Sequence, residues 1–258
     1  MTQKLDTTFI QIVHPVCCGL DVHKKKISAC LITITENGEE QYEIKKFGTF
    51  THDLLTMKNW LTDNHCPIIA MESTGVYWRP VHNILEGYLE IILVNARHIK
   101  NVPGRKTDIG DSKWFAGLLR NGLLRGSFIP PKEIRQWREL TRLRRTYTES
   151  LADYKRRIHK LFETANIKID SVVSDLFGVT GRNLISLLCK GSELSLANIK
   201  ENAKRGLKEK SEELHHSIQG LFEDHHRFQL VGMMEMITTF EKHISEITHR
   251  MDALTAGH

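Results

Sequence analysis

The sequence predicts an α/β domain followed by an all-helical domain. Over the first 125 residues, short segments rich in apolar and β-branched residues alternate with helical patterns. Pro130-Pro131 marks a boundary, because proline ends one segment and can begin the next helix. Beyond this pair, apolar residues recur every three or four positions, as on one face of a helix. We therefore expect two domains, at residues 1–129 and 130–258.

Strands open the first domain. Val16–Val22 and Ile27–Thr35 have the composition of strands, and Asn37-Gly38 predicts a hairpin that leads into a third strand at Gln41–Phe50. Two later segments, Pro67–Met71 and Leu89–Val94, are short and apolar, which is typical of strands buried inside a parallel sheet. The sequence thus predicts five strands.

Helices are expected between and after the later strands. The apolar spacing predicts one from Thr51 or His52 through Leu61, a second from about Val76 to Gly87, and a third from about Asp108 to Asn121. Three antiparallel strands followed by alternating helices and strands is the order of an RNase H-like fold. We expect such an α/β domain, with a mixed sheet, at residues 1–129.

The second domain begins with a long amphipathic pattern. Its apolar positions form a heptad-like stripe, comprising Leu140, Leu143, Tyr147, Leu151, Tyr154, Ile158 and Leu161. A helix of about 35 residues would be ~50 Å long and could not bury this stripe alone. The segment Ser211 to Leu254 offers a partner, with Leu214, Ile218, Leu221, Met236, Phe240, Ile244, Ile247, Met251 and Leu254. We expect an elongated all-α hairpin or a dimerising coiled coil.

Composition excludes several classes of protein. The chain has 258 residues, 40% hydrophobic residues and a mean hydropathy of −0.32, which are globular values and not those of a collagen, a disordered tail or a membrane bundle. No stretch holds the ~18 uncharged apolar residues of a membrane span. The apolar stretch from Phe9 to Val22 lacks the basic start and small-residue end of a signal peptide. We expect a cytoplasmic protein with no membrane partner.

Positive charge is concentrated in one quarter of the chain. The net charge is only +5, yet the segment from Arg97 to Lys160 holds 17 Lys and Arg against 6 Asp and Glu. A local field of this sign favours a nucleic-acid partner over a merely solvated helix surface. The candidate phosphate-binding residues are Arg105, Lys106, Arg142, Arg144, Arg145, Arg156 and Arg157.

The remaining motifs indicate no further site. The five cysteines show no CxxC spacing, so we expect reduced, buried thiols and not a zinc site. Gly104-Arg105-Lys106-Thr107 lacks the first glycine of a phosphate loop. The pairs His215-His216 and His225-His226 have no Cys or Glu at fitting spacing, and we interpret them as exposed or interface residues.

Four acidic residues stand at the ends of predicted elements. Asp21 lies at the end of the first strand, Glu72 follows the strand Pro67–Met71, and Asp108 and Asp111 open the following helix on one face. Each alone could be a surface acid, and Asp108 could be a helix N-cap. Together they predict one pocket for Mg²⁺ or Mn²⁺, because hard oxygen ligands select these ions. Two such ions ~3.5–4 Å apart can catalyse phosphoryl transfer.

Four ordered segments carry a family resemblance. The segments Gly19–Lys24, Met71–Trp78, Asn95–Ser112 and Ser174–Arg182 resemble those of the insertion sequence 110 transposases. The third includes an unusual DxxD spacing, formed by Asp108 and Asp111, after an Arg-Lys loop. Pilin-gene invertases share this domain.

The resemblance implies a RuvC-like domain followed by a coiled-coil domain. It implies that Asp21, Glu72, Asp108 and Asp111 are the catalytic, metal-binding acids of a Mg-dependent DNA transposase or recombinase. It also implies a homo-oligomer, a dimer or tetramer formed through the helical domain, and guidance by a structured non-coding RNA. Family members continue into a C-terminal domain with a nucleophilic serine. We expect this chain to lack that domain, and we assign the serine's role to no residue.

Two other functions remain open at this stage. A stand-alone nuclease of the Holliday-junction-resolvase type would use the same acids and would need no further domain. A non-catalytic binding protein or self-associating regulator would bind nucleic acid without cleaving it. Metal-dependent nicking of branched DNA by this chain would favour the first, and binding that is unaffected by replacing the acids would favour the second.

Overall fold

The computed structural model describes residues 12–73, 75–95 and 110–255. The chain divides into two compact units, residues 1–129 and 130–258, and each is described by itself. None of the helices in these described ranges is both long enough and apolar enough to cross a membrane.

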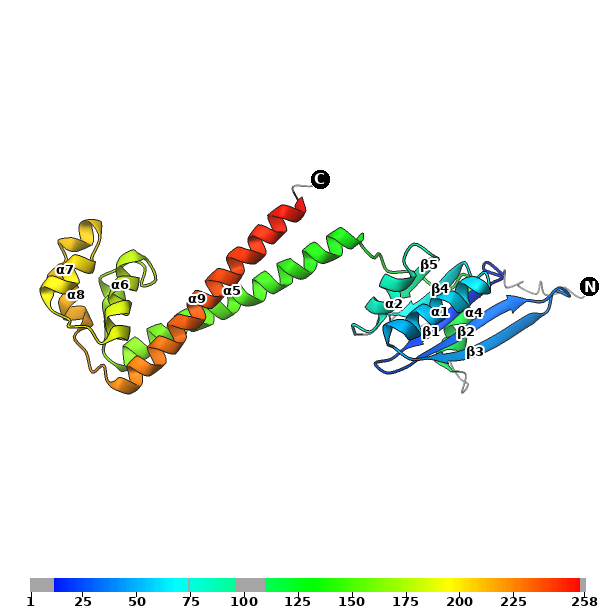
Figure 1. Cartoon of the computed structure of the whole chain (residues 1–258), viewed down its shortest axis with the longest axis horizontal. Helices are drawn as coiled ribbons and strands as arrows, with labels where there is room; N and C mark the ends of the chain where they lie inside the picture. The colour runs from blue at the N-terminus through cyan, green and yellow to red at the C-terminus, as the bar shows by residue number, and fades with distance from the viewer. Residues whose placement is uncertain (1–11, 74, 96–109, 256–258) are drawn as a thin grey trace, which may run out of the picture. The chain divides into compact units, whose positions relative to one another are not determined.

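The first unit contains a mixed five-stranded sheet (Figure 1). The strand order is β3-β2-β1-β4-β5, with antiparallel pairing of β1 with β2 and of β2 with β3, and parallel pairing of β1 with β4 and of β4 with β5. The strands are β1 (Cys17–Val22), β2 (Ile27–Ile34), β3 (Glu40–Phe47), β4 (Ile68–Glu72) and β5 (Glu90–Val94). This is the strand order and polarity of an RNase H-like fold, so the predicted fold class is confirmed.

Helices cover both faces of this sheet. Alternate residues of a strand point to opposite faces, so each central strand contributes to two cores. Leu20 and Met71 belong to the core under α1 (Thr51–Asp63) and α2 (Trp78–Leu85). Cys17 and Ala70 belong to the core under α4 (Asp111–Arg120). The face of the sheet that α4 covers is the one that carries the candidate site.

The element boundaries differ in part from the predicted ones. β3 ends at Phe47 because Phe50 already caps α1, where the Phe50 N–H donates to the Asp53 carboxylate at 3.2 Å. The helix expected from Val76 begins at Trp78. The helix expected from Asp108 is described from Asp111 onward, and Asp108 itself lies outside the described residues.

The second unit is built on two long helices. α5 and α9 lie side by side and run in opposite directions, with the shorter helices gathered at one end (Figure 1). Tyr147 and Tyr154 of α5 pack on Phe240 of α9, at ring-centroid distances of 5.7 and 5.8 Å. The helices are α5 (Lys132–Thr164), α6 (Val179–Lys190), α7 (Leu196–Asn202), α8 (Ser211–Ile218) and α9 (Asp224–Thr255), with short 3-10 turns at Ile169–Ser171 and Arg205–Lys208.

The predicted apolar stripe of α5 is buried unevenly. Ile158 and Leu161 lie in the core of the unit, with Ile237 of α9. Leu143, which was expected in the same buried stripe, is 41% exposed. Within one chain, α5 therefore packs against α9 along most of its length. Part of the apolar stripe of α5 still faces solvent.

The expected second helical run is broken in the middle. α8 ends at Ile218 and α9 starts at Asp224. At Gly220 an added Cβ would lie 2.3 Å from the carbonyl oxygen of Ala165, so the backbone approaches too closely for a side chain. The N–H of Leu221 donates to the same carbonyl at 2.7 Å. Leu221 was expected to pack against the first long helix, but it is 74% exposed because the chain turns there.

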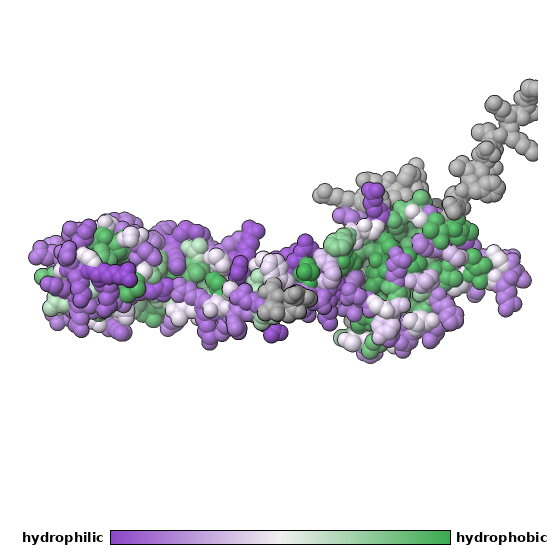
Figure 2. Space-filling view, turned by 90° about the horizontal axis from the view of Figure 1, so that it is seen from above, coloured by the Kyte–Doolittle hydropathy of each residue, from purple (hydrophilic) through white to green (hydrophobic). Residues whose placement is uncertain are grey.

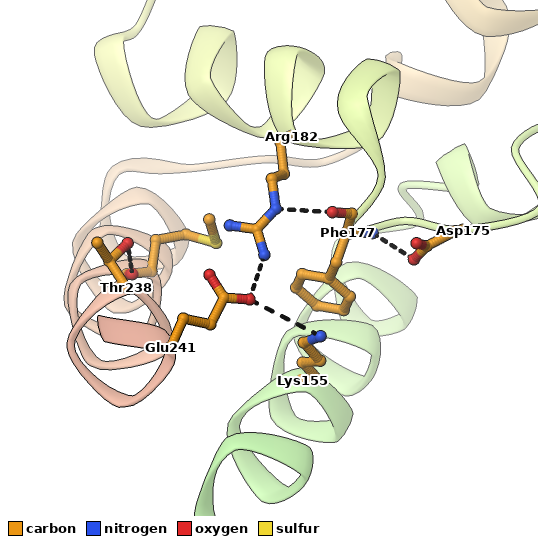
Figure 3. Close-up of polar contacts among 7 residues, drawn as sticks. Lys155, Asp175, Phe177, Arg182, Thr238 and Glu241 are labelled. Carbon is orange, nitrogen blue, oxygen red and sulfur yellow. Dashed lines mark hydrogen bonds and ion pairs between the residues drawn. The ribbon is translucent and has the colours of Figure 1, made fainter. Parts of the chain in front are cut away.

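A polar network joins three helices of this unit (Figure 3). Arg182 of α6 donates to the Phe177 carbonyl at 2.6 Å and forms an ion pair with Glu241 of α9. Lys155 of α5 lies 4.0 Å from the same carboxylate. The Phe177 N–H in turn donates to Asp175 at 2.9 Å. The segment Ser174–Arg182, noted above for its family resemblance, therefore fixes α6 against the long helix pair.

The cysteines are all free thiols, as expected. Four are buried, whereas Cys189 is half-buried, which differs from the expectation that all five are buried. Burial raises the pKa of the Cys17 thiol to about 12 and that of Cys66 to about 11. These thiols therefore remain protonated at neutral pH, which is the state of structural and not of reactive cysteines.

Candidate functional site

Asp21 and Glu72 occupy equivalent positions on adjacent parallel strands. β1 pairs with β4 up to Leu20 opposite Met71, so Asp21 and Glu72 are the next residue of each strand. Neighbouring strands are about 4.8 Å apart. Since Leu20 and Met71 point into the core under α1 and α2, the two acids share the opposite face. Both are half-buried. The register thus brings the first two predicted acids together.

The start of α4 lies over the same row. A Cβ at Gly19 would be 2.2 Å from the carbonyl oxygen of Ser112, so a glycine is required for α4 to lie this close to β1. Ser28 pairs with Asp21 across the β1–β2 ladder, and its Oγ lies 3.1 Å from Oγ of Ser112. Asp111, the residue before Ser112 and the first of α4, is therefore brought to the edge of the sheet where Asp21 lies.

The N-terminus of α4 favours a carboxylate at position 111. The first turn of a helix presents unpaired N–H groups and a partial positive charge, which stabilise a nearby acid. Asp111 is the acidic residue of the first turn of α4. Of the four predicted acids, the structure gathers Asp21, Glu72 and Asp111 at one edge of the sheet, and Asp108 lies outside the described residues.

One contact of the site was not anticipated. Nε2 of His23 lies 3.0 Å from Oδ2 of Asp21. The Asp21 side chain is 24% exposed and that of His23 is 56% exposed. His23 lies directly after β1, two residues beyond Asp21, and this i, i+2 spacing at the end of the strand is the sequence signal that could have predicted the contact. The hydrogen bond occupies one carboxylate oxygen and thereby limits the rotation of the other.

The donor set fits a hard divalent cation. Asp21 and Glu72 offer carboxylate oxygens from half-buried, adjacent positions, and like charges so placed repel one another unless a cation lies between them. Oxygen-only donors suit Mg²⁺ or Mn²⁺ and not zinc, which prefers nitrogen and sulfur. The residues present are therefore compatible with the predicted ion.

The predicted phosphate-binding arginines of α5 are solvent-accessible. Arg142, Arg145, Arg156 and Arg157 are exposed and Arg144 is half-buried. Two of them are already engaged, since Arg145 pairs with Glu149 at 2.8 Å and Arg156 pairs with Asp153. Arg105 and Lys106 lie outside the described residues. Figure 2 shows that the visible side of the helical unit is mostly hydrophilic.

The second histidine pair does have a carboxylate neighbour. Glu223, His225 and His226 offer ligand atoms within 4.8 Å of one another, so the expectation that this pair lacks a Glu partner is wrong. The group nevertheless lies at the start of α9, with Glu223 directly before the helix, and the Glu223 N–H donates to Nδ1 of His226 at 3.1 Å. His225 also pairs with Glu223 at 3.3 Å, in an exposed position. These contacts account for the arrangement as a helix start.

Residues 18–167 match the family model of the DEDD transposases of insertion sequence 110, which is described as transposase. The chain belongs to this family. The match confirms the resemblance carried by the first three sequence segments, and the fourth, Ser174–Arg182, lies beyond the matched residues. The match includes Asp21, Glu72, Asp108 and Asp111, and continues through α5 into the helical unit.

No curated protein matches the transposase chain significantly. Among solved structures, the chain is similar to a fowlpox virus resolvase, whose crystal structure contains substrate Holliday junction DNA. The identity is 12% and the TM-score 0.26, and the alignment covers 40% of this chain and 72% of the resolvase. The RNase H-like fold rests on the strand order and register of the sheet.

Proposed function

We propose that this transposase cleaves and exchanges DNA strands at the edge of the sheet where Asp21, Glu72 and Asp111 gather, with Asp108 as a fourth acid. The observation that supports the proposal is the register that sets Asp21 beside Glu72 under the start of α4. In this proposal the four acids hold Mg²⁺ or Mn²⁺. A bound divalent ion would supply an activated water or hydroxyl and would stabilise charge on the phosphate oxygens.

The residues of the chain have separate tasks in this proposal. The carboxylates orient the ion, and His23 holds Asp21 by its hydrogen bond. The exposed arginines of α5, above all Arg142 and Arg157, contact phosphates of the backbone without reading sequence. Binding through such contacts should weaken steeply as salt concentration rises.

Two further partners belong to the proposal. We propose a structured non-coding guide RNA on the family resemblance, with the same arginines as its phosphate contacts. We also propose a dimer or tetramer formed through the helical unit, in which the exposed part of the α5 stripe around Leu143 is available to a second copy. The five free cysteines agree with a reducing compartment, and we propose the cytoplasm as the location.

Conservative substitution of the acids tests the function. In the transposase, Asp21→Asn and Glu72→Gln should each lower strand cleavage by roughly two orders of magnitude or more, because each removes a metal-ligating charge worth several kcal/mol in the transition state. Binding of Mn²⁺, measured by titration calorimetry, should fall in parallel. Circular dichroism should show an unchanged fold.

Matched controls are available at the opposite edge of the sheet. Asp63 and Glu90 are exposed, at the end of α1 and the start of β5. Asp63→Asn and Glu90→Gln remove the same charges there, and should leave cleavage and Mn²⁺ binding unchanged. Full cleavage activity in both Asp21→Asn and Glu72→Gln would refute the proposed role of the acids. Metal-dependent nicking of branched DNA by the 258-residue chain would instead favour a stand-alone nuclease.

A further inference from the structure

A lysine-rich hairpin lies at the same edge of the sheet as the acids. The turn between β1 and β2 holds Lys24, Lys25 and Lys26, which directly follow His23, and all three lysines are exposed. The turn is closed by the His23 N–H, which donates to the Lys26 carbonyl at 3.0 Å. The Thr49 hydroxyl donates to the Lys24 carbonyl at 3.0 Å and braces the hairpin from the β3–α1 connection. These two hydrogen bonds fix the backbone of the turn that carries the three lysines.

A fourth lysine lies in the row of the acids themselves. Ser28 pairs with Asp21 on one side and with Lys46 on the other, so a single row across the sheet contains Lys46, Ser28, Asp21 and Glu72. Lys46 is exposed. At about 4.8 Å per strand, its backbone lies roughly 10 Å from that of Asp21. That spacing is short enough for one nucleic-acid strand to contact both.

The neighbour of Lys46 points to the other face. Phe47 packs in the core under α1, and Nζ of Lys45 lies 5.6 Å from the Phe47 ring centroid and 5.5 Å from that of Trp60. Successive residues of β3 thus present their positive charges on opposite faces of the sheet. Lys46 shares the face of the acids and Lys45 does not.

These four lysines are not neutralised within the described part of the chain. Lys24, Lys25, Lys26 and Lys46 form no ion pair there, whereas Arg145 and Arg156 of α5 are paired with carboxylates of their own helix. A row of acids repels a polyanion, and unpaired positive charges about 10 Å away offset that repulsion on one side of the row. The lysines flank the acids on the β3 side.

We propose that Lys24, Lys25, Lys26 and Lys46 form a binding flank for the phosphates of the DNA strand that is cleaved at the acids. This inference rests on the proposed function and extends it by naming how the substrate strand approaches: from the β3 side of the sheet, along the β1–β2 hairpin. The lysines contact the phosphodiester backbone and carry no sequence preference.

The proposed role of Lys46 can be tested by comparing it with Lys45, its neighbour on the opposite face of β3. Lys46→Gln and Lys45→Gln remove the same charge from neighbouring positions of one strand. With a labelled DNA duplex that contains a strand break, the full chain carrying Lys46→Gln should bind several-fold more weakly, and its plot of log affinity against log salt should lose about one unit of slope. Lys45→Gln should match the unaltered chain in both measurements. Lys46→Arg, which keeps the charge, should restore the affinity.

The hairpin is tested by a triple change. Lys24→Gln, Lys25→Gln and Lys26→Gln together should lower DNA affinity by at least tenfold, with a loss of up to about three units of salt slope. The corresponding triple arginine variant should bind like the unaltered chain. Circular dichroism establishes that each variant is folded, and calorimetry with Mn²⁺ alone should show ion binding unchanged.

The outcomes separate this inference from the proposed function. If the unaltered chain binds DNA and Mn²⁺ but Lys46→Gln and the triple glutamine variant bind DNA as tightly as Lys45→Gln, the lysine flank is refuted and the metal site stands. If the unaltered chain binds no Mn²⁺, the proposed metal site fails whatever the lysines do. Weakened binding of an RNA of the same sequence, with DNA binding intact, would also overturn the inference.

Discussion

At the scale of single residues, the position of one glycine determines how the candidate site is built. Gly19 lies between two buried residues of β1, and its missing side chain lets the backbone of Ser112 approach. This approach brings the start of α4, with Asp111, to the row of Asp21. A larger residue at this position would separate the acids without changing any of them.

Gly19→Ala therefore should damage both stability and the site. The added Cβ would lie 2.2 Å from a backbone oxygen of α4, so the helix must shift. Overpacking of this kind costs about 1–3 kcal/mol of the free energy of unfolding. Mn²⁺ binding should weaken as well, because Asp111 moves with the helix. Urea unfolding and calorimetry measure the two effects.

The control for this change lies in α4 itself. A Cβ at Gly117 would meet no atom within 4 Å. Gly117→Ala should be neutral or should stabilise the helix by up to about 1 kcal/mol, because alanine has the higher helix propensity. Equal destabilisation by both substitutions would contradict the close approach of α4 at Gly19.

At the scale of elements, the contact between α5 and α9 organises the second unit. Phe240 packs against two tyrosines of α5, and a polar network of Arg182, Glu241 and Lys155 adds α6 to the pair. Neither long helix could bury its apolar stripe alone. The pairing of the two helices therefore provides much of the burial that stabilises each of them.

Phe240→Ala should loosen this helix pair. It removes two aromatic contacts, each worth about 1 kcal/mol beyond the area that is buried, so the free energy of unfolding should fall by about 2 kcal/mol or more. Leu221→Ala is the matched control at an exposed apolar residue and should change stability by less than about 0.5 kcal/mol. Thermal unfolding followed by circular dichroism distinguishes the two, and equal effects would argue against the α5–α9 contact.

At the scale of the whole molecule, the described residues form one set of core residues in each compact unit. One is formed by the sheet with α1, α2 and α4, and the other by helices of the second unit. The compact units meet in sequence at Ile129 and Pro130, the boundary that the proline pair indicates. The acids lie in the first unit, and the α5 arginines in the second.

Separately expressed fragments, residues 12–129 and 130–258, should each unfold cooperatively, because each has a core of its own. Mn²⁺ binding should remain with the first fragment. Calorimetric scans of both fragments and of the full chain measure the unfolding transitions, and titration calorimetry measures Mn²⁺ binding. A fragment without a cooperative transition would show that its core depends on the other unit.

The sequence by itself determined the order of elements and the boundary, and it yields the prediction of four metal-binding acids. β-branched composition, the Asn37-Gly38 turn and the 3.6-residue period of α5 are local signals, and they depend only on neighbours along the chain. From such signals the strands, most helices and the expectation that Asp21 and Glu72 meet could be derived.

Tertiary structure decided the rest, because it depends on contacts between residues distant in sequence. The contact of Ser28 with Ser112 and the break in the last helical run at Gly220 are not visible as periodicity. Nor is the placement of Lys46 in the row of the acids, which follows from two successive strand registers. Register is set by how whole strands bury their apolar face, and a single-residue shift would move every side chain to the opposite face.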